Sequence, residues 1–215
     1  MSMTFEQLKR ERIIAILRHI PKNRADGLIE ALANAGVVFV EATLNSDGAL
    51  AMISRWRERY GEKMRIGAGT VLDLNMAKEA ISAGAEYLIA PNLDESVVNY
   101  ARQQSTDVYP GAMTPTEIVQ AWNAGATAVK VFPMASLGLD YLREVRAPLS
   151  HIPMVATGGV RLNNIHEFLQ IGAVAVGLGG SIVNMSLIKE GRFEEIERNA
   201  AKLVQAAKLV GKYDQ

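Results

Sequence analysis

One segment pattern recurs four times along this chain, and this repeat is the feature that most constrains the fold. The four copies begin at Ala35, Ala83, Ala124 and Ile171 and read AGVVFVEATL, AGAEYLIAPN, AGATAVKVFP and IGAVAVGLGG. Each copy follows a helical pattern, carries a glycine where a helix end needs a left-handed residue, and continues into a short apolar run suited to a buried parallel strand. Each interval between copies has room for two βα units, because one unit needs about 30 residues or fewer.

Four further apolar runs complete a set of eight predicted strands. They span residues 13–18, 64–70, 106–111 and 152–158. A doubly wound sheet also alternates strands with helices, but it usually has a glycine-rich turn after its first strand, where this chain has Arg18-His19-Ile20. The sequence therefore predicts an α/β fold, a single (β/α)8 TIM barrel that spans residues 1–215 as one domain.

Composition limits the partners and the compartment. Lys plus Arg equals Asp plus Glu at 23 each, so no basic field favours nucleic acid as a partner. The absence of cysteine excludes disulfides and cysteine-based zinc sites and is compatible with a reducing cytosol. The first apolar stretch, residues 13–17, is too short for a signal sequence or a membrane span. We therefore expect a cytoplasmic protein with no membrane partner.

The repeat also identifies equivalent positions inside the predicted barrel. The residues five positions after the repeat glycines are Glu41, Ile89, Lys130 and Gly177. Alternate strands supply the four side chains of one interior layer, so Glu41 and Lys130 are expected to face each other. One interpretation is an ion pair that only fills the barrel. A chemical role is favoured, because a buried ion pair stabilises little, whereas desolvation gives lysine the neutral amine that attacks carbonyls and glutamate can transfer protons.

Glycine pairs at the ends of the last two strands predict an anion site. Gly158-Gly159 ends the seventh strand, and Gly180-Ser181 follows the eighth, before a helix predicted over 182–187. Loops at these places, with backbone N–H groups and a helix N-terminus, are the usual phosphate site of this fold, although a glycine pair alone is usually a tight turn. Arg18, at the end of the first strand, suits a substrate carboxylate, or else is a solvated rim residue. His19, His151 and His166 lack metal-ligand spacing, so we predict no metal.

A set of motifs in fixed order resembles a known family over essentially the whole chain. The motifs are Ile16-Leu17-Arg18, Val40-Glu41-Ala42-Thr43-Leu44, Gly67-Ala68-Gly69-Thr70-Val71-Leu72, Pro110-Gly111 with Thr114-Pro115-Thr116-Glu117, Val129-Lys130-Val131-Phe132-Pro133, Ala156-Thr157-Gly158-Gly159 and Gly179-Gly180-Ser181. With them the sequence resembles the 2-keto-3-deoxy-6-phosphogluconate (KDPG) and 4-hydroxy-2-oxoglutarate (KHG) aldolases. The resemblance implies a class I aldolase, metal-independent and without a cofactor, and a homotrimer.

The resemblance also implies roles for individual residues. Lys130 matches the Schiff-base lysine and Glu41 the general acid/base. The carboxylate and imine pocket is expected to comprise Arg18, Thr70, Pro91 and Phe132, and the phosphate site Gly158, Gly159, Gly180 and Ser181. Thr157 resembles the KDPG type and Asn45 the phosphogalactonate (KDPGal) type, so both are candidate contacts of the C4 hydroxyl. His19 replaces a frequent glycine.

The expected substrate is a 2-keto-3-deoxy sugar acid phosphate, cleaved to pyruvate and D-glyceraldehyde 3-phosphate. KDPG is favoured, with activity on 4-hydroxy-2-oxoglutarate also expected. The alternatives are a KDPGal aldolase, a phosphosugar epimerase or isomerase that forms no imine, and a sugar-phosphate-binding barrel without catalysis.

Overall fold

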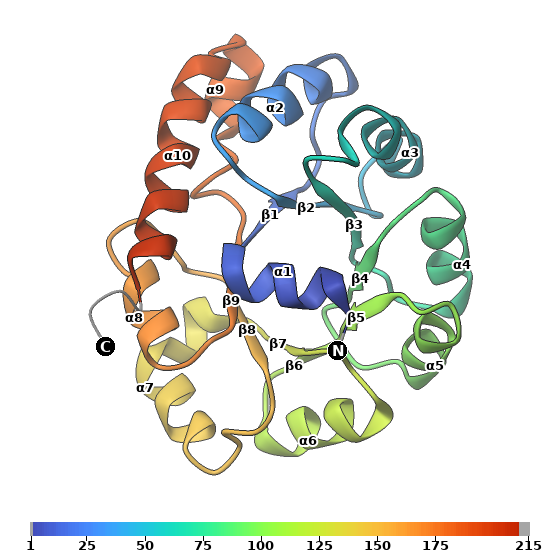
Figure 1. The fold of residues 1–215 in the computed structure, drawn as a ribbon, viewed down its shortest axis with the longest axis vertical. Helices are drawn as coiled ribbons and strands as arrows, with labels where there is room; N and C mark the ends of the chain where they lie inside the picture. Colours follow the sequence, from blue (N-terminus) through green and yellow to red (C-terminus); the bar gives the residue numbers. More distant parts are fainter. Residues whose placement is uncertain (1, 211–215) are drawn as a thin grey trace.

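The computed structural model describes residues 2–210. In it parallel strands form a barrel that is surrounded by helices (Figure 1). The strands are β1 (Ile13–Leu17), β2 (Phe39–Thr43), β3 (Arg65–Gly69), β4 (Tyr87–Ile89), β5 (Asp107–Tyr109), β6 (Gly111–Ala112), β7 (Val129–Val131), β8 (Met154–Thr157) and β9 (Ala175–Leu178). The helices are α1 (Met3–Glu11), α2 (Lys22–Asn34), α3 (Ala49–Tyr60), α4 (Leu74–Ser82), α5 (Glu95–Gln103), α6 (Pro115–Ala124), α7 (Met134–Arg146), α8 (Ile165–Gln170), α9 (Met185–Glu190) and α10 (Phe193–Leu209).

The barrel closes through a strand that a proline divides. Neighbouring strands follow the order β5-β4-β3-β2-β1-β9-β8-β7-β6, and their pairings are parallel. β5 and β6 are separated only by Pro110, which has no N–H to donate. The carbonyl of Tyr109 accepts from Ala90 N at 3.2 Å, and that of Pro110 accepts from Lys130 N at 2.9 Å. Because this divided strand joins β4 to β7, the prediction of a (β/α)8 TIM barrel is confirmed.

The repeat glycines have the left-handed conformation expected of them. Their φ angles are 81° at Gly36, 98° at Gly84, 101° at Gly125 and 108° at Gly172, values that a residue with a Cβ adopts only under strain. Each copy of the repeat therefore leaves its helix in the same way and enters its strand in the same phase. This is why positions five residues further along are structurally equivalent.

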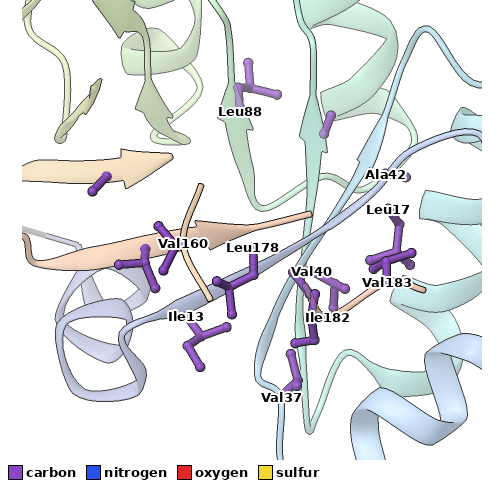
Figure 2. Close-up of a cluster of buried hydrophobic side chains, with 14 of the residues drawn as sticks. Ile13, Leu17, Val37, Val40, Ala42, Leu88, Val160, Leu178, Ile182 and Val183 are labelled. Carbon is purple, nitrogen blue, oxygen red and sulfur yellow. The ribbon is translucent and has the colours of Figure 1, made fainter. Parts of the chain in front are cut away.

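Side chains on the two faces of the strands pack into two separate cores. On β1, Ile14 belongs to the core inside the barrel, whereas Ile13 and Leu17 belong to the outer core between strands and helices. Figure 2 shows part of the outer core, where Val40 and Leu178 of neighbouring strands also contribute. The inner core consists of Phe5, Leu8, Ile14, Phe39, Tyr87, Ile89, Tyr109, Ala128, Val155 and Ala175.

Helix α1 closes one end of the barrel, and in Figure 1 it lies across the barrel centre. Its Phe5 and Leu8 are fully buried in the inner core, and the Phe5 and Tyr109 ring centroids are 6.4 Å apart. Ser2 caps the helix by accepting from Phe5 N at 3.0 Å, and its hydroxyl donates to the buried Asp107 carboxylate at 2.5 Å. The opposite end of the barrel therefore carries the opening to solvent.

Candidate active site

Lys130 of β7 and Glu41 of β2 both lie buried inside the barrel. Their exposed fractions are 5% and 1%. The Lys130 ammonium nitrogen lies 4.8 Å from the ring centroid of Phe132, which is two residues further along the chain. Within residues 2–210 no ion pair joins Lys130 directly to Glu41, and Glu41 Oε2 has no hydrogen-bond partner. The geometry therefore differs from a tight ion pair that only fills the barrel.

Glycines on neighbouring strands leave the space that these side chains occupy. A Cβ at Gly69 of β3 would lie 2.5 Å from Glu41 Oε1, and a Cβ at Gly177 of β9 would lie 2.6 Å from Thr157 Oγ1. Such distances are too short for carbon and oxygen, so any larger residue at either position would displace a polar side chain. The missing side chains at 69 and 177 thus give the barrel its polar interior near the opening.

Burial shifts the pKa values of both groups toward their neutral forms. Burial raises the pKa of Glu41 from 4.5 to about 7, and the positive charges of Lys130 and Arg18 oppose this rise only in part. Burial also lowers the pKa of Lys130 from 10.5; the Glu41 carboxylate opposes that fall and Arg18 adds to it. A carboxyl group that titrates near neutrality can both donate and accept protons, and an amine with a lowered pKa is more often nucleophilic.

A pocket of about 680 Å³ is lined by Lys130 at its inner end, and Glu41 is not among its lining residues. Eight of the predicted site residues line it: Arg18, Lys130, Phe132, Thr157, Gly158, Gly159, Gly180 and Ser181. They come from the ends of β1, β7, β8 and β9 and from the segments that follow. The fold therefore brings these eight residues, which are far apart in the sequence, together around one pocket.

Two turns give the pocket a wall of backbone N–H groups. Gly158 and Gly159 have φ angles of 101° and 73°, and a Cβ at Gly159 would lie 2.9 Å from Ala135 Cα. Among residues 2–210, the N–H groups of Gly159, Gly180 and Ser181 have no hydrogen-bond acceptor. The helix predicted over 182–187 begins later, at Met185, because the Asn184 side chain caps it. Residues before Asn184 form a turn instead, so the N–H groups at 180 and 181 belong to a loop.

The remaining predicted residues lie around or below the pocket. Glu41 lies deeper in the barrel, and the Arg18 guanidinium donates to Thr70 Oγ1 at 3.4 Å. The backbone carbonyl of Pro91 lies against Gly111, where a Cβ would approach it to 2.2 Å. Asn45 is exposed, in the turn after β2, and is not among the residues that line the pocket.

Two polar side chains that line the pocket, Arg161 and His19, were given no role from the sequence. Arg161 lines the pocket two residues after Gly159, and among residues 2–210 its guanidinium makes no ion pair or hydrogen bond. His19 also lines it, with a φ angle of 52° and a backbone N–H that donates to Ser46 Oγ at 2.8 Å. Because Arg161 follows the predicted phosphate loop at Gly158-Gly159, the sequence alone could have identified it as a candidate anion-binding residue.

No group of three or more His, Cys, Asp or Glu side chains is arranged to hold a metal ion within residues 2–210. Within the same described part of the chain, no helix has both the length and the apolar composition to cross a membrane.

The fold and the site define a (β/α)8 barrel with a buried lysine and glutamate beneath a glycine-walled pocket. The family model of the KDPG and KHG aldolases matches residues 5–199. The chain belongs to this family of aldolases, which are lyases.

Individual relatives agree with this assignment. The 2-dehydro-3-deoxy-6-phosphogalactonate aldolase of Escherichia coli strain K12 is 34% identical over 202 residues, which is 94% of each chain. The 2-dehydro-3-deoxy-phosphogluconate aldolase of Treponema pallidum strain Nichols is 30% identical over 202 residues, 94% of this chain and 96% of its own. A solved structure described as native KDPGal superposes with a TM-score of 0.86 at 33% identity, and the match covers 92% of this chain and 95% of that one.

Proposed function

We propose that this protein cleaves KDPG to pyruvate and D-glyceraldehyde 3-phosphate through a Schiff base on Lys130. One observation carries the proposal: a buried amine with a lowered pKa and a carboxyl with a pKa of about 7 share the barrel interior under the pocket. A neutral amine is needed to attack a ketone, and a group that titrates near pH 7 is suited to moving protons in both directions.

The proposed reaction begins when the Lys130 amine adds to the C2 ketone and water leaves, which forms an iminium ion. Glu41, as carboxylate, removes the C4 hydroxyl proton through a water molecule. The C3–C4 bond breaks, its electron pair moves to the iminium as an enamine, and the aldehyde departs. The protonated Glu41 then returns a proton to C3, and hydrolysis of the imine releases pyruvate and the free lysine.

The pocket offers separate positions for the two charged ends of this substrate. Arg18 would bind the carboxylate next to the imine, with Thr70, Pro91 and Phe132 around it. The free N–H groups of Gly159, Gly180 and Ser181, with Gly158, would bind the phosphate. We also propose activity on 4-hydroxy-2-oxoglutarate, which has no phosphate, and a cytosolic homotrimer as the family resemblance implies.

Borohydride reduction in the presence of pyruvate tests the covalent step. We expect irreversible inactivation and a reduced pyruvyl adduct on Lys130, because only an imine is trapped in this way. Mass spectrometry of a digest locates the adduct. Lys130→Met, which has a side chain of similar length, is the control and should not be labelled. Cleavage that persists without an adduct, or an adduct on another lysine, contradicts the proposal and favours an epimerase-like site.

KDPGal is the second candidate substrate, because the E. coli relative that is 34% identical is named for it and Asn45 resembles that type. We expect cleavage of both C4 epimers with an advantage for KDPG of about tenfold to a hundredfold in kcat/KM, since one buried hydrogen bond is worth about 1–3 kcal/mol. Thr157, whose hydroxyl lies in the pocket wall, would make that bond. Thr157→Val should therefore shrink the ratio of the two kcat/KM values. A wild-type preference for KDPGal contradicts this assignment.

Ser181→Ala tests the phosphate position. We expect KM for KDPG to rise by roughly threefold to a hundredfold, the loss of one hydrogen bond to a charged group, with little change in kcat. Cleavage of 4-hydroxy-2-oxoglutarate serves as the internal control and should barely change. Equal losses on the two substrates would mean that Ser181 only shapes the loop.

A further inference from the structure

A second polar group lies inside the barrel beneath Glu41. Tyr87 of β4 is fully buried, and its hydroxyl has no hydrogen-bond partner among residues 2–210; the same is true of Glu41 Oε2. Buried hydroxyl and carboxyl oxygens are almost always hydrogen-bonded to protein or to an ordered water. The Tyr87 ring and the Glu41 carboxyl group both lie against glycines of β3, so these two groups, which lack partners among the described residues, point to a shared partner.

Two glycines of β3 fix how these side chains lie relative to each other. A Cβ at Gly67 would lie 2.4 Å from Tyr87 Cζ, and a Cβ at Gly69 would lie 2.6 Å from Glu41 Cδ. Both glycines face inward on one strand, so their side-chain positions are about 7 Å apart. The phenol and the carboxyl group thus rest on successive levels of the same strand face, with no side chain of β3 between them.

We propose that Tyr87 is a positioning residue, which donates through one buried water to Glu41 and so holds the carboxylate in its proton-transferring form. This inference rests on the proposed role of Glu41. Burial raises the pKa of Tyr87 well above 10.0, and the charge of Glu41 adds to this rise, followed by Tyr109 and Glu86. The hydroxyl therefore keeps its proton and remains a hydrogen-bond donor. The charged groups that act on Glu41 itself are Lys130 and Arg18.

The chain offers a matched control in Tyr109. Its hydroxyl is also buried and unpartnered within residues 2–210, and its ring centroid is 5.8 Å from that of Tyr87. The charge that acts on Tyr109 is Asp107 at the α1 end of the barrel, and Glu41 does not affect it. Tyr109→Phe therefore removes an equivalent hydroxyl from the same core without touching the proposed link.

The experiment measures the Glu41 pKa directly from the pH dependence of its carboxyl infrared band. Subtracting the spectrum of Glu41→Gln from that of the wild-type protein isolates this band. Tyr87→Phe should raise this pKa by about half a unit to one unit, the loss of one hydrogen bond to the charged form. The acidic limb of the kcat profile should move equally, which lowers kcat at pH 7 about two- to fivefold and leaves KM unchanged. Tyr109→Phe should alter neither.

Equal shifts in the two variants, or no shift in Tyr87→Phe, overturn the proposal. Because the infrared titration needs no turnover, it reports on the link even if borohydride trapping contradicts the Schiff base. If Tyr87→Phe does not fold, a high-resolution crystal structure of the wild-type protein decides. A water within hydrogen-bond distance of both Tyr87 Oη and Glu41 Oε2 supports the link, and its absence refutes it.

Discussion

Lys130→Met is expected to lower kcat/KM by at least about four orders of magnitude, as removal of the nucleophile does in other covalent enzymes. Methionine matches lysine in length and can occupy the same buried space beside Phe132, but it cannot form an imine. The fall in kcat/KM should therefore occur without unfolding. Steady-state cleavage of KDPG, measured with circular dichroism and the melting temperature on the same preparation, separates the two effects.

The stability of this variant gives an independent check on the buried amine. Burial lowers the pKa of Lys130, so the charged form costs stability at neutral pH, and that cost disappears only above the unfolded-state pKa of about 10.5. Replacement by an apolar side chain removes the cost, while Glu41 can take up a proton because its pKa is about 7. We expect Lys130→Met to melt at or above the wild-type temperature at pH 6. A large fall in melting temperature would mean that the lysine supports the fold.

Glu41→Gln is expected to lower kcat about 10²- to 10⁴-fold, the usual contribution of a positioned acid/base group, without preventing imine formation. Glutamine keeps the shape of the protonated carboxyl group but cannot act as an acid or a base near neutral pH. Borohydride with pyruvate should therefore still label Lys130 in this variant, although cleavage is slow. Loss of labelling together with cleavage would show that Glu41 is needed to form the imine itself.

The same substitution has a stability effect that depends on pH. The folded-state pKa of Glu41, about 7, lies above its ordinary value of 4.5, so ionising it in the folded protein costs stability. That cost is absent below about pH 4.5, grows as the pH rises, and is complete above about pH 7. The difference in unfolding free energy between Glu41→Gln and wild type should therefore rise by about 2–3 kcal/mol from pH 5 to pH 8 in favour of the variant. Urea unfolding at a series of pH values measures it, and a pH-independent difference contradicts the raised pKa.

The periodic part of the fold could be predicted from the sequence because it depends on local chemistry. The glycines at 36, 84, 125 and 172 have positive φ, and their spacing to Glu41 and Lys130 follows from the strand repeat. Breaks in that regularity were harder to predict. Pro110 divides the fifth strand, which the repeat does not indicate. In the sequence α1 looks like an ordinary short amphipathic helix, and only the folded barrel shows that it covers one end of the inner core.

The positions of the candidate site residues were predictable where strand ends carry them and less so where loops do. Lys130, Phe132 and Thr157 lie in the pocket wall as the strand phase requires. Arg161 and Asn45 depend on the paths of segments beyond the strand ends, and no periodic pattern determines such paths. Tyr87 was missed for another reason: an aromatic residue in a buried strand usually contributes only packing, and the unpartnered hydroxyl is visible only in three dimensions.

The position of α1 has a consequence for how the chain folds as it is synthesised. Phe5 and Ser2 find their partners on β5, and the Arg12 guanidinium, just after the helix, donates to the carbonyl of Val210 at 2.6 Å. Glu11 also pairs with Lys208 of α10 at 2.9 Å. Helix α1 and the residues just after it therefore complete these contacts only after the chain has been synthesised as far as Val210. The apolar face of α1 stays exposed for most of translation, so nascent chains stalled before α10 should be the ones that chaperones bind.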